Sequence, residues 1–359
     1  MRWDNLLTDN NQMTAKLPLF ADEAVVRSFK TPEFKGMTFY EVNAKSIINH
    51  VAGDRFGFNW TINPYRGCSH SCVYCFARPT HTYLDFNSGS DFDTKIVVKV
   101  NAVELLRTEL RRKSWPGASI AMGTNTDPYQ RAEGHYRLTR KILIELNAAR
   151  NPYSILTKGT LIQRDIDVLV EGASMMDVST CFSVGTIDDD VWRMTEPGTP
   201  HPLKRLEVVR RLNEAGVPCG VLMAPILPGI SDDPDLLKRT VEAIAEAGAT
   251  SVSPIVLHLR KGVKEEFMSW LEDAFPHLTS GYMKMYGRTT APKEVTAPIG
   301  RVVAATKSRL GYATNLVSAK SADAAPNMGA AQSQLALDLM PSRKRKAPKW
   351  VKDPLTTGH

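Results

Sequence analysis

The sequence has no long apolar run and few cysteines. No stretch approaches the roughly 18 consecutive apolar residues that a membrane-spanning helix needs, so we expect no such helix. The first residues, MRWDNLLTDNNQMTAK, lack the apolar core of a secretory signal peptide. Five cysteines, an odd number with three bunched together, do not fit a disulfide framework. These absences predict a protein of the reducing cytoplasm.

Net positive charge is small in most of the chain. The net charge is +7, but the last twenty residues contain six Lys and Arg residues against one Asp, so five of those charges lie there. A nearly neutral body gives no reason to expect that it binds nucleic acid, whereas the basic end of the chain is a candidate for such binding. At 359 residues, the chain is long enough for one large domain with extensions.

Short β-rich runs alternate with amphipathic helices through the middle of the chain. Strands are expected at 58–62, 119–123, 153–157, 177–184, 217–226 and 251–257. Helices are expected at 101–113, 136–149, 161–172, 202–215, 234–247 and 264–275. Strands that alternate with helices form a parallel sheet with crossovers of one hand. Six units are fewer than a closed eight-strand barrel needs, so an α/β fold with an open, partial (β/α)6 barrel is predicted.

The boundaries of this barrel follow from changes in pattern. Residues 1–50 are weakly patterned and are expected to form an N-terminal covering segment, followed by the barrel at 51–290 and a helical extension at 291–320. From 321 to 359, Ala, Pro, Ser, Gln and Lys dominate, which predicts a disordered tail. The run KIVVKV at 95–100 interrupts the alternation and is interpreted as an insertion.

Three thiols follow the first predicted strand directly. Cys68, Cys72 and Cys75 have the spacing C-x3-C-x2-C. A structural zinc site normally takes four ligands in two separated pairs, and His70 is poorly placed as a fourth ligand within so tight a loop. Ferredoxin clusters take four thiolates at other spacings. A [4Fe–4S] cluster held at three irons, with the fourth open to a small molecule, explains why no fourth cysteine stands nearby. Zinc binding and chance remain the alternatives.

The cysteine motif, with the aromatic Tyr74 before its last member, resembles the signature of radical S-adenosylmethionine (SAM) enzymes. NPYRGCSHSCVYCFAR, GTNTDPYQRAEG, ILTKGTLIQRDIDVL and MAPILPGISD occur in that order. Together they resemble the spore photoproduct lyase-like branch, often labelled DNA repair photolyase, and above all its members of unassigned substrate. The resemblance implies that the open iron binds the amino and carboxylate groups of SAM, and that reductive cleavage of SAM gives a 5′-deoxyadenosyl radical.

Further polar residues follow the predicted strands. Sites in parallel β/α barrels gather at the carboxyl ends of the strands, where we expect the cysteine loop, TNTDPYQ and PILPG to meet. The resemblance implies that Asn125 or Asp127 receives the amino group of SAM and that Lys158 meets its carboxylate. It also implies that Ser183 reaches the carboxylate or ribose, and that the backbone of Tyr74 lies near the adenine. The alternatives are an ordinary Asp-Pro turn and a solvated lysine.

Spore photoproduct lyase uses a cysteine to return hydrogen to its product radical. Cys181 shares strand parity with Ser183, so it points into the barrel if Ser183 does. Cys181 is therefore a candidate hydrogen donor, with a small buried hydrophobic side chain as the alternative. Cys219 opens the next strand at the end away from the site.

The tail contains a possible docking peptide. Gln334 to Leu339, QLALDL, resembles the short Gln-Leu-x-Leu-x-Leu peptides that bind the bacterial DNA sliding clamp, in which spaced leucines fill a groove. A chance apolar patch is the alternative. The neighbouring basic run offers contacts to the phosphates of a nucleic acid, or it is only solubilising. By the resemblance, a flavodoxin- or ferredoxin-like protein supplies electrons.

Three functions therefore remain open. The leading hypothesis is a lyase-like radical SAM enzyme that acts on DNA in lesion repair. A second keeps the cofactors but has a protein or small molecule as substrate, which the neutral body favours. The third is an iron–sulfur protein that senses redox state or recruits a partner. Polar residues after several further strands argue against the third, because a sensor does not need a SAM site.

Overall fold

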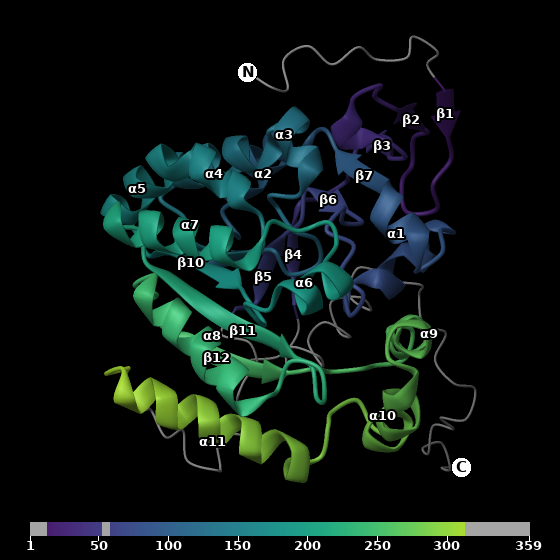
Figure 1. Cartoon of the computed structure of the whole chain (residues 1–359). Coiled ribbons are helices and arrows are strands. Elements are labelled where there is room, and N and C mark those ends of the chain that lie inside the picture. The colour runs from purple at the N-terminus through teal and green to yellow at the C-terminus, as the bar shows by residue number, and fades with distance from the viewer. Residues whose placement is uncertain (1–12, 52–57, 313–359) are drawn as a thin grey trace, which may run out of the picture.

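The computed structural model describes residues 13–51 and 58–312, which form two sheets flanked by helices (Figure 1). The larger sheet has the strand order β12-β11-β10-β9-β8-β5-β4. Its strands are β4 (Ile48–His50), β5 (Trp60–Ile62), β8 (Ile120–Met122), β9 (Tyr153–Thr157), β10 (Val178–Ser183), β11 (Cys219–Ile226) and β12 (Val252–Val256).

The larger sheet is an open, partial barrel. The six strands from β5 to β12 are parallel to their neighbours, and β4 adds to β5 in antiparallel orientation. No pairing between β12 and β4 closes the sheet within the described parts of the chain. The predicted (β/α)6 architecture and the positions of its six strands are confirmed.

Helices cover the convex face of this sheet. They are α2 (Ala102–Leu110), α4 (Leu138–Ala148), α5 (Ile166–Met175), α7 (Pro202–Glu214), α8 (Pro234–Glu246) and α11 (Lys293–Arg309). Alternation along the strands decides which side chains they bury: Val178 and Phe182 of β10 join the core beneath the helices, whereas Ser179 and Ser183 face the concave side. The concave face therefore keeps small and polar residues near the strand ends.

The smaller sheet corrects one interpretation. Its order is β1-β2-β3-β7-β6, with β1 (Met13–Ala15), β2 (Ala24–Arg27), β3 (Thr38–Val42), β6 (Tyr65–Arg66) and β7 (Lys95–Lys99). The run at 95–100 is not an insertion, because β7 pairs with both β3 and β6. Ile96 and Val98 pack against Phe39 on one face, and Val97 packs on the other, which explains why the run is apolar without alternation. Before residue 51, β1, β2 and β3 thus belong to the smaller sheet, whereas β4 belongs to the larger one.

Shorter helices complete the described chain. They are α1 (Ser90–Thr94), α3 (Arg131–Tyr136), α6 (Asp189–Thr195), α9 (Lys264–Ala274) and α10 (Thr279–Met285). In Figure 1, β1, β2, β3 and β7 lie on one side of the molecule, while α11 runs along α8 and β12 on the other. Among the described helices, none is long and apolar enough to cross a membrane. The whole of the predicted tail, 321–359, with its motifs, lies outside the described residues.

Candidate functional site

A cavity of about 190 Å³ lies at the carboxyl ends of the parallel strands. Eight of the nine site residues expected from the sequence line it: Cys68, Cys72, Tyr74, Cys75, Asn125, Asp127, Lys158 and Ser183. Aliphatic side chains line it as well: Leu156 of β9, Leu222 of β11, and Ile255 and Val256 of β12. We call the thiols and polar groups the polar wall and these aliphatic side chains the apolar wall.

The cysteine loop is fixed by its backbone. The Cys68 N–H donates to Phe92 O (2.9 Å), and Ser71 N–H donates to Cys68 O (3.3 Å). Gly67 has a φ of +79°, and a Cβ added there would lie 2.9 Å from Phe92 O. Only glycine fits this close, left-handed position without strain. The loop therefore has one backbone path, which places the three thiols at the cavity.

Burial raises the pKa of the Cys68, Cys72 and Cys75 thiols. In Cys68 and Cys72 the nearby acids Asp127 and Glu196 add to this effect. Such thiols stay protonated unless a positive group stabilises the thiolate, and a bound metal does so. Their chemistry therefore suits ligands of a metal centre better than free nucleophiles.

Two side chains not singled out as site residues hold this loop in place. Gln130, fully buried, accepts from Ser69 N (3.0 Å) and donates to Gly67 O (3.0 Å) and Thr126 Oγ1 (2.8 Å). Arg78 donates to Cys72 O through Nη2 (3.0 Å) and pairs with Asp93 (2.9 Å). Arg78 is therefore a buried structural residue and not a solvated loop arginine.

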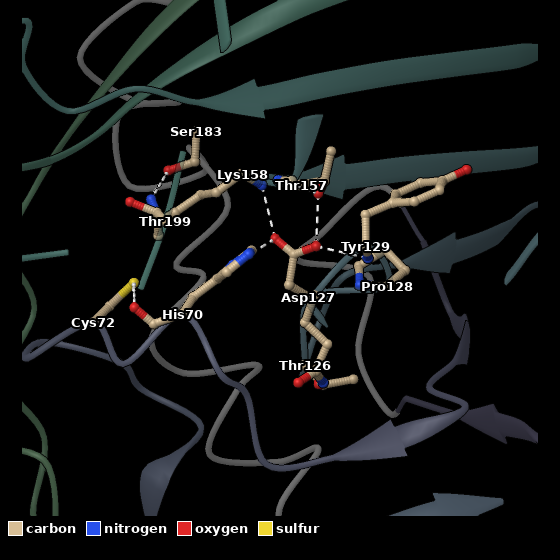
Figure 2. Close-up of polar contacts among 12 residues, drawn as sticks. His70, Cys72, Thr126, Asp127, Pro128, Tyr129, Thr157, Lys158, Ser183 and Thr199 are labelled. Carbon is tan, nitrogen blue, oxygen red and sulfur yellow. Dashed lines mark hydrogen bonds and ion pairs between the residues drawn. The ribbon is translucent and has the colours of Figure 1, made fainter. Parts of the chain in front are cut away.

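Asp127 occupies a different role from the one predicted. Its carboxylate accepts from Tyr129 N (2.8 Å), Thr157 Oγ1 (2.6 Å) and Lys158 N (2.7 Å), and it pairs with His70 Nδ1 (3.3 Å), as Figure 2 shows. Burial raises its pKa, but His70 and the donors outweigh burial, so the pKa lies below the ordinary value. With both oxygens engaged, Asp127 ties the cysteine loop to the end of β9 and does not offer an open acceptor.

Asn125 is the polar residue of this segment that stays available. Its backbone N–H donates to Asn63 Oδ1 (3.1 Å), while its side chain is buried at the cavity wall. No hydrogen bond joins its amide group to another of the described side chains or backbone groups. Asn125 therefore retains donor and acceptor capacity for a ligand.

Lys158 projects from the end of β9 into a polar group that the sequence did not reveal. Its Nζ lies 2.5 Å from Ser183 Oγ (Figure 2) and 3.2 Å from Glu196 Oε1. Glu196 also accepts from Tyr74 OH and Arg205. Burial alone would raise the pKa of Glu196. The positive charges of Arg205 and Lys158 outweigh burial and lower the pKa to about 2. Glu196 is therefore ionised, and a single sequence offers no pattern that would have marked it.

Cys181 is the one predicted residue that the cavity does not include. It lies two residues before Ser183 on β10, beside Gly220 of β11, and it is absent from the cavity lining. Burial raises its pKa to about 12, so it is a thiol and not a thiolate near neutral pH. Cys219 is fully buried in the core beneath the helices.

A family model decides the assignment. The model described as "Radical SAM superfamily" matches residues 62–241, which span the cysteine loop, Lys158 and Ser183. The chain belongs to the radical SAM superfamily. Membership implies an iron–sulfur cluster, SAM and a source of electrons for this radical SAM protein.

Relatives of this radical SAM protein occur in bacteria and a virus. An uncharacterized protein of Mycobacterium tuberculosis (strain ATCC 25618 / H37Rv) is 47% identical over 292 residues, covering 80% of this chain and 86% of the relative. An uncharacterized protein of Acidianus two-tailed virus is 27% identical over 232 residues, covering 63% of this chain and 75% of its own length. These relatives share the sequence family without adding a substrate.

The fold is also that of a solved enzyme. Spore photoproduct lyase complexed with dinucleoside spore photoproduct matches with a TM-score of 0.58 and 16% identity, covering 76% of this chain and 79% of the lyase chain. At this identity the likeness concerns the fold. It agrees with the branch to which the sequence motifs pointed.

Proposed function

We propose that this protein is an enzyme that holds a [4Fe–4S] cluster through Cys68, Cys72 and Cys75 and cleaves SAM bound in the same cavity. The observation that carries the proposal is the meeting of three thiols with Asn125 and Lys158 at one cavity. When bound, the cluster and SAM supply a 5′-deoxyadenosyl radical that removes hydrogen from a substrate. The remaining steps concern how the chain places and protects these groups.

The donor set suits a cluster better than a single ion. Within residues 13–51 and 58–312, no three His, Cys, Asp or Glu side chains are grouped as ligands of one metal ion. In a cluster each thiolate binds a different iron, so the sulfur atoms need not converge on one point. A cluster held by three thiolates also leaves one iron to take a small-molecule ligand, which a four-cysteine site does not.

The polar wall suits the amino-acid part of SAM. Lys158 offers a cation for the carboxylate, held by Ser183, whose hydroxyl in turn donates to Ala224 O (2.7 Å). Asn125 offers its free amide to the amino group. Asp127 acts on this site by fixing the backbone of Lys158. Tyr74 lines the same wall, and we place its backbone near the adenine.

The apolar wall suits the adenosyl part and the exclusion of water. Leu156, Leu222 and Val256 present aliphatic surface to the cavity. Such a wall makes few directional contacts and keeps bulk water from a reactive intermediate. Cys181 is not among the residues that line the cavity, and its role as hydrogen donor stays a prediction.

Anaerobic reconstitution tests the proposal directly. Protein loaded with iron and sulfide, reduced with dithionite and given SAM should release 5′-deoxyadenosine. Cys72→Ala should lose the cluster and the product, whereas Cys219→Ala, a cysteine in the core beneath the helices, should keep both. Zinc in protein purified without oxygen, or full cluster loading without SAM cleavage, would contradict the proposal.

For the substrate, we propose DNA carrying a base lesion. The support is the shared fold of a lyase solved with a dinucleoside photoproduct, together with the sequence motifs of that branch. Loaded enzyme should release more 5′-deoxyadenosine with ultraviolet-irradiated DNA than with intact DNA, and the photoproducts should disappear. Equal release with both DNAs would favour the second candidate, a protein or small-molecule substrate, which the neutral body and the apolar wall support.

Three proposed partners remain to be tested. A flavodoxin- or ferredoxin-like protein is proposed as the electron donor. Clamp docking through Gln334 to Leu339 and nucleic-acid contacts of the basic run stay predictions, since both segments lie outside the described residues.

A further inference from the structure

A buried ion pair stands directly behind Lys158. Arg205 of α7 is fully buried and pairs with Glu196, which follows α6. Arg205 also donates to Pro200 O (2.7 Å), Ser183 O (2.9 Å) and Thr199 Oγ1 (2.5 Å). Neither Glu196 nor Arg205 lines the cavity. Both touch residues that do.

Hydrogen-bonding capacity in this group is used unequally. One oxygen of Glu196 accepts from Tyr74 OH and lies 3.2 Å from Lys158 Nζ in an ion pair, and the other accepts from Arg205. The guanidinium of Arg205 is engaged at all three nitrogens. An ammonium group has three donors; that of Lys158 gives one to Ser183 Oγ and lies in ion-pair contact with Glu196. Its remaining capacity, at the cavity wall, is left for a ligand.

The charges of Lys158, Glu196 and Arg205 suggest what the ion pair does. Lys158 and Arg205 each carry one positive charge and Glu196 one negative charge, so the group is left with a single positive charge. Without Arg205, the buried carboxylate would neutralise Lys158 and an incoming carboxylate would meet no net charge. Without Glu196, Lys158 would lose its anchor but stand near a second positive charge. Opposite charges at close range act strongly in such a water-poor setting.

We propose that Glu196 and Arg205 are positioning residues that set the place and the effective charge of Lys158 for the carboxylate of SAM. Glu196 holds the ammonium against the cavity wall and orients Tyr74 of the cysteine loop through the same oxygen. Arg205 cancels the charge of Glu196, so that Lys158 keeps its own. This inference rests on the proposed function, because it requires SAM in the cavity.

Equilibrium dialysis of the cluster-loaded protein against SAM and against decarboxylated SAM tests the inference. The ratio of the two dissociation constants isolates the carboxylate. In the wild type SAM should bind more tightly. In Arg205→Met the preference for SAM should fall by about 10- to 100-fold, the range of one charge-assisted hydrogen bond. In the double variant Glu196→Gln/Arg205→Met, the single positive charge returns and most of the preference should return with it.

Glu196→Gln alone separates charge from support. Gln keeps an acceptor for Lys158 and leaves two positive charges, so the preference for SAM should be kept or rise. A merely structural role predicts a loss in Glu196→Gln as in Arg205→Met. Arg193→Met serves as the control, because Arg193 is an exposed arginine of α6 whose removal changes the net charge equally. Should Arg205→Met fail to fold, Glu196→Gln alone still tests the inference, because a lost preference for SAM in that variant contradicts the charge role.

The outcomes distinguish the two proposals. A wild type that binds neither ligand refutes the SAM site and this inference together. A wild type that prefers SAM, with an unchanged preference in folded Arg205→Met, refutes only the role of the ion pair. A loss that the double variant does not restore shows that the pair supports structure and does not set charge.

Discussion

The two walls of the cavity are built in different ways. On the side of the cysteine loop, Gln130, Arg78 and Asp127 each make several hydrogen bonds, and these side chains are buried or nearly so. On the side of β11 and β12, Leu222, Ile255 and other aliphatic groups line the wall, and packing replaces directional contacts. A wall held by polar contacts has one geometry. A wall of aliphatic side chains tolerates different shapes, so we expect the first to hold the cluster and the amino-acid part of SAM, and the second to accommodate the adenosyl part and the substrate.

Removing Arg78 should give the largest effect. Arg78→Met leaves Asp93 without its partner and Cys72 O without two of its donors. Breaking a largely buried ion pair from one side costs about 3–5 kcal/mol of unfolding free energy. Urea unfolding and iron content should both fall. A variant with wild-type stability and full iron content would show that the loop is not held by this contact.

Removing Gln130 should cost somewhat less. Gln130→Leu leaves Ser69 N without a partner inside the protein, whereas Gly67 O keeps its hydrogen bond from Thr126 Oγ1 (2.7 Å). One unmet buried donor costs about 1–3 kcal/mol. Cluster content should drop with stability. Gln163→Leu, at a partly exposed glutamine after β9, is the matched control and should shift unfolding by about 0.5 kcal/mol or less.

Lowering the pH should reveal how much the carboxylate of Glu196, behind the polar wall, contributes to the unfolding free energy. Glu196 has a pKa of about 2 when folded against an ordinary value of 4.5. Because the folded pKa is depressed, its ionised form stabilises the protein above about pH 4.5, and this contribution is lost as the pH falls toward 2. The unfolding free energy of the wild type should therefore drop more steeply over that window than that of Glu196→Gln. Parallel pH profiles would contradict the shift.

The apolar wall should give the smallest effect on stability. Leu222 is only half-buried, so Leu222→Ala should cost about 1 kcal/mol in unfolding free energy, below the range for a fully buried leucine. Iron content should stay near that of the wild type, while SAM affinity falls severalfold because aliphatic contact is lost. A loss of iron as large as in Gln130→Leu would erase the distinction between the walls.

Much of the fold follows from periodicity. The runs at 153–157 and 177–184 alternate, with one parity buried under the helices, and both are strands of the larger sheet. The run at 95–100 was misjudged because a strand with two buried faces does not alternate, and its partner β3 lies more than fifty residues earlier. Local patterns report burial, but they do not report which distant strand provides it.

The site was predictable in part for a similar reason. The cysteine spacing and the predicted strand ends pointed to eight residues that line the cavity described above. Spacing does not show how a side chain spends its hydrogen bonds, so Asp127 and Asn125 could not be told apart in the sequence. Glu196 directly follows α6 and Arg205 lies on α7, and nothing in the sequence of either segment distinguishes these two residues from other charged residues. Their meeting with Lys158 depends on tertiary packing.

One carboxylate, that of Asp127, joins the ring of His70 to the main chain of Lys158. The side chain of Asp127 therefore connects the cysteine loop to the backbone of Lys158 and helps to set the distance between them. Asp127→Glu would lengthen this connection by a methylene group and move the cysteine loop away from Lys158 without removing any charge. The effect of Asp127→Glu on SAM cleavage would therefore show how closely the enzyme must control the distance between the cluster and SAM.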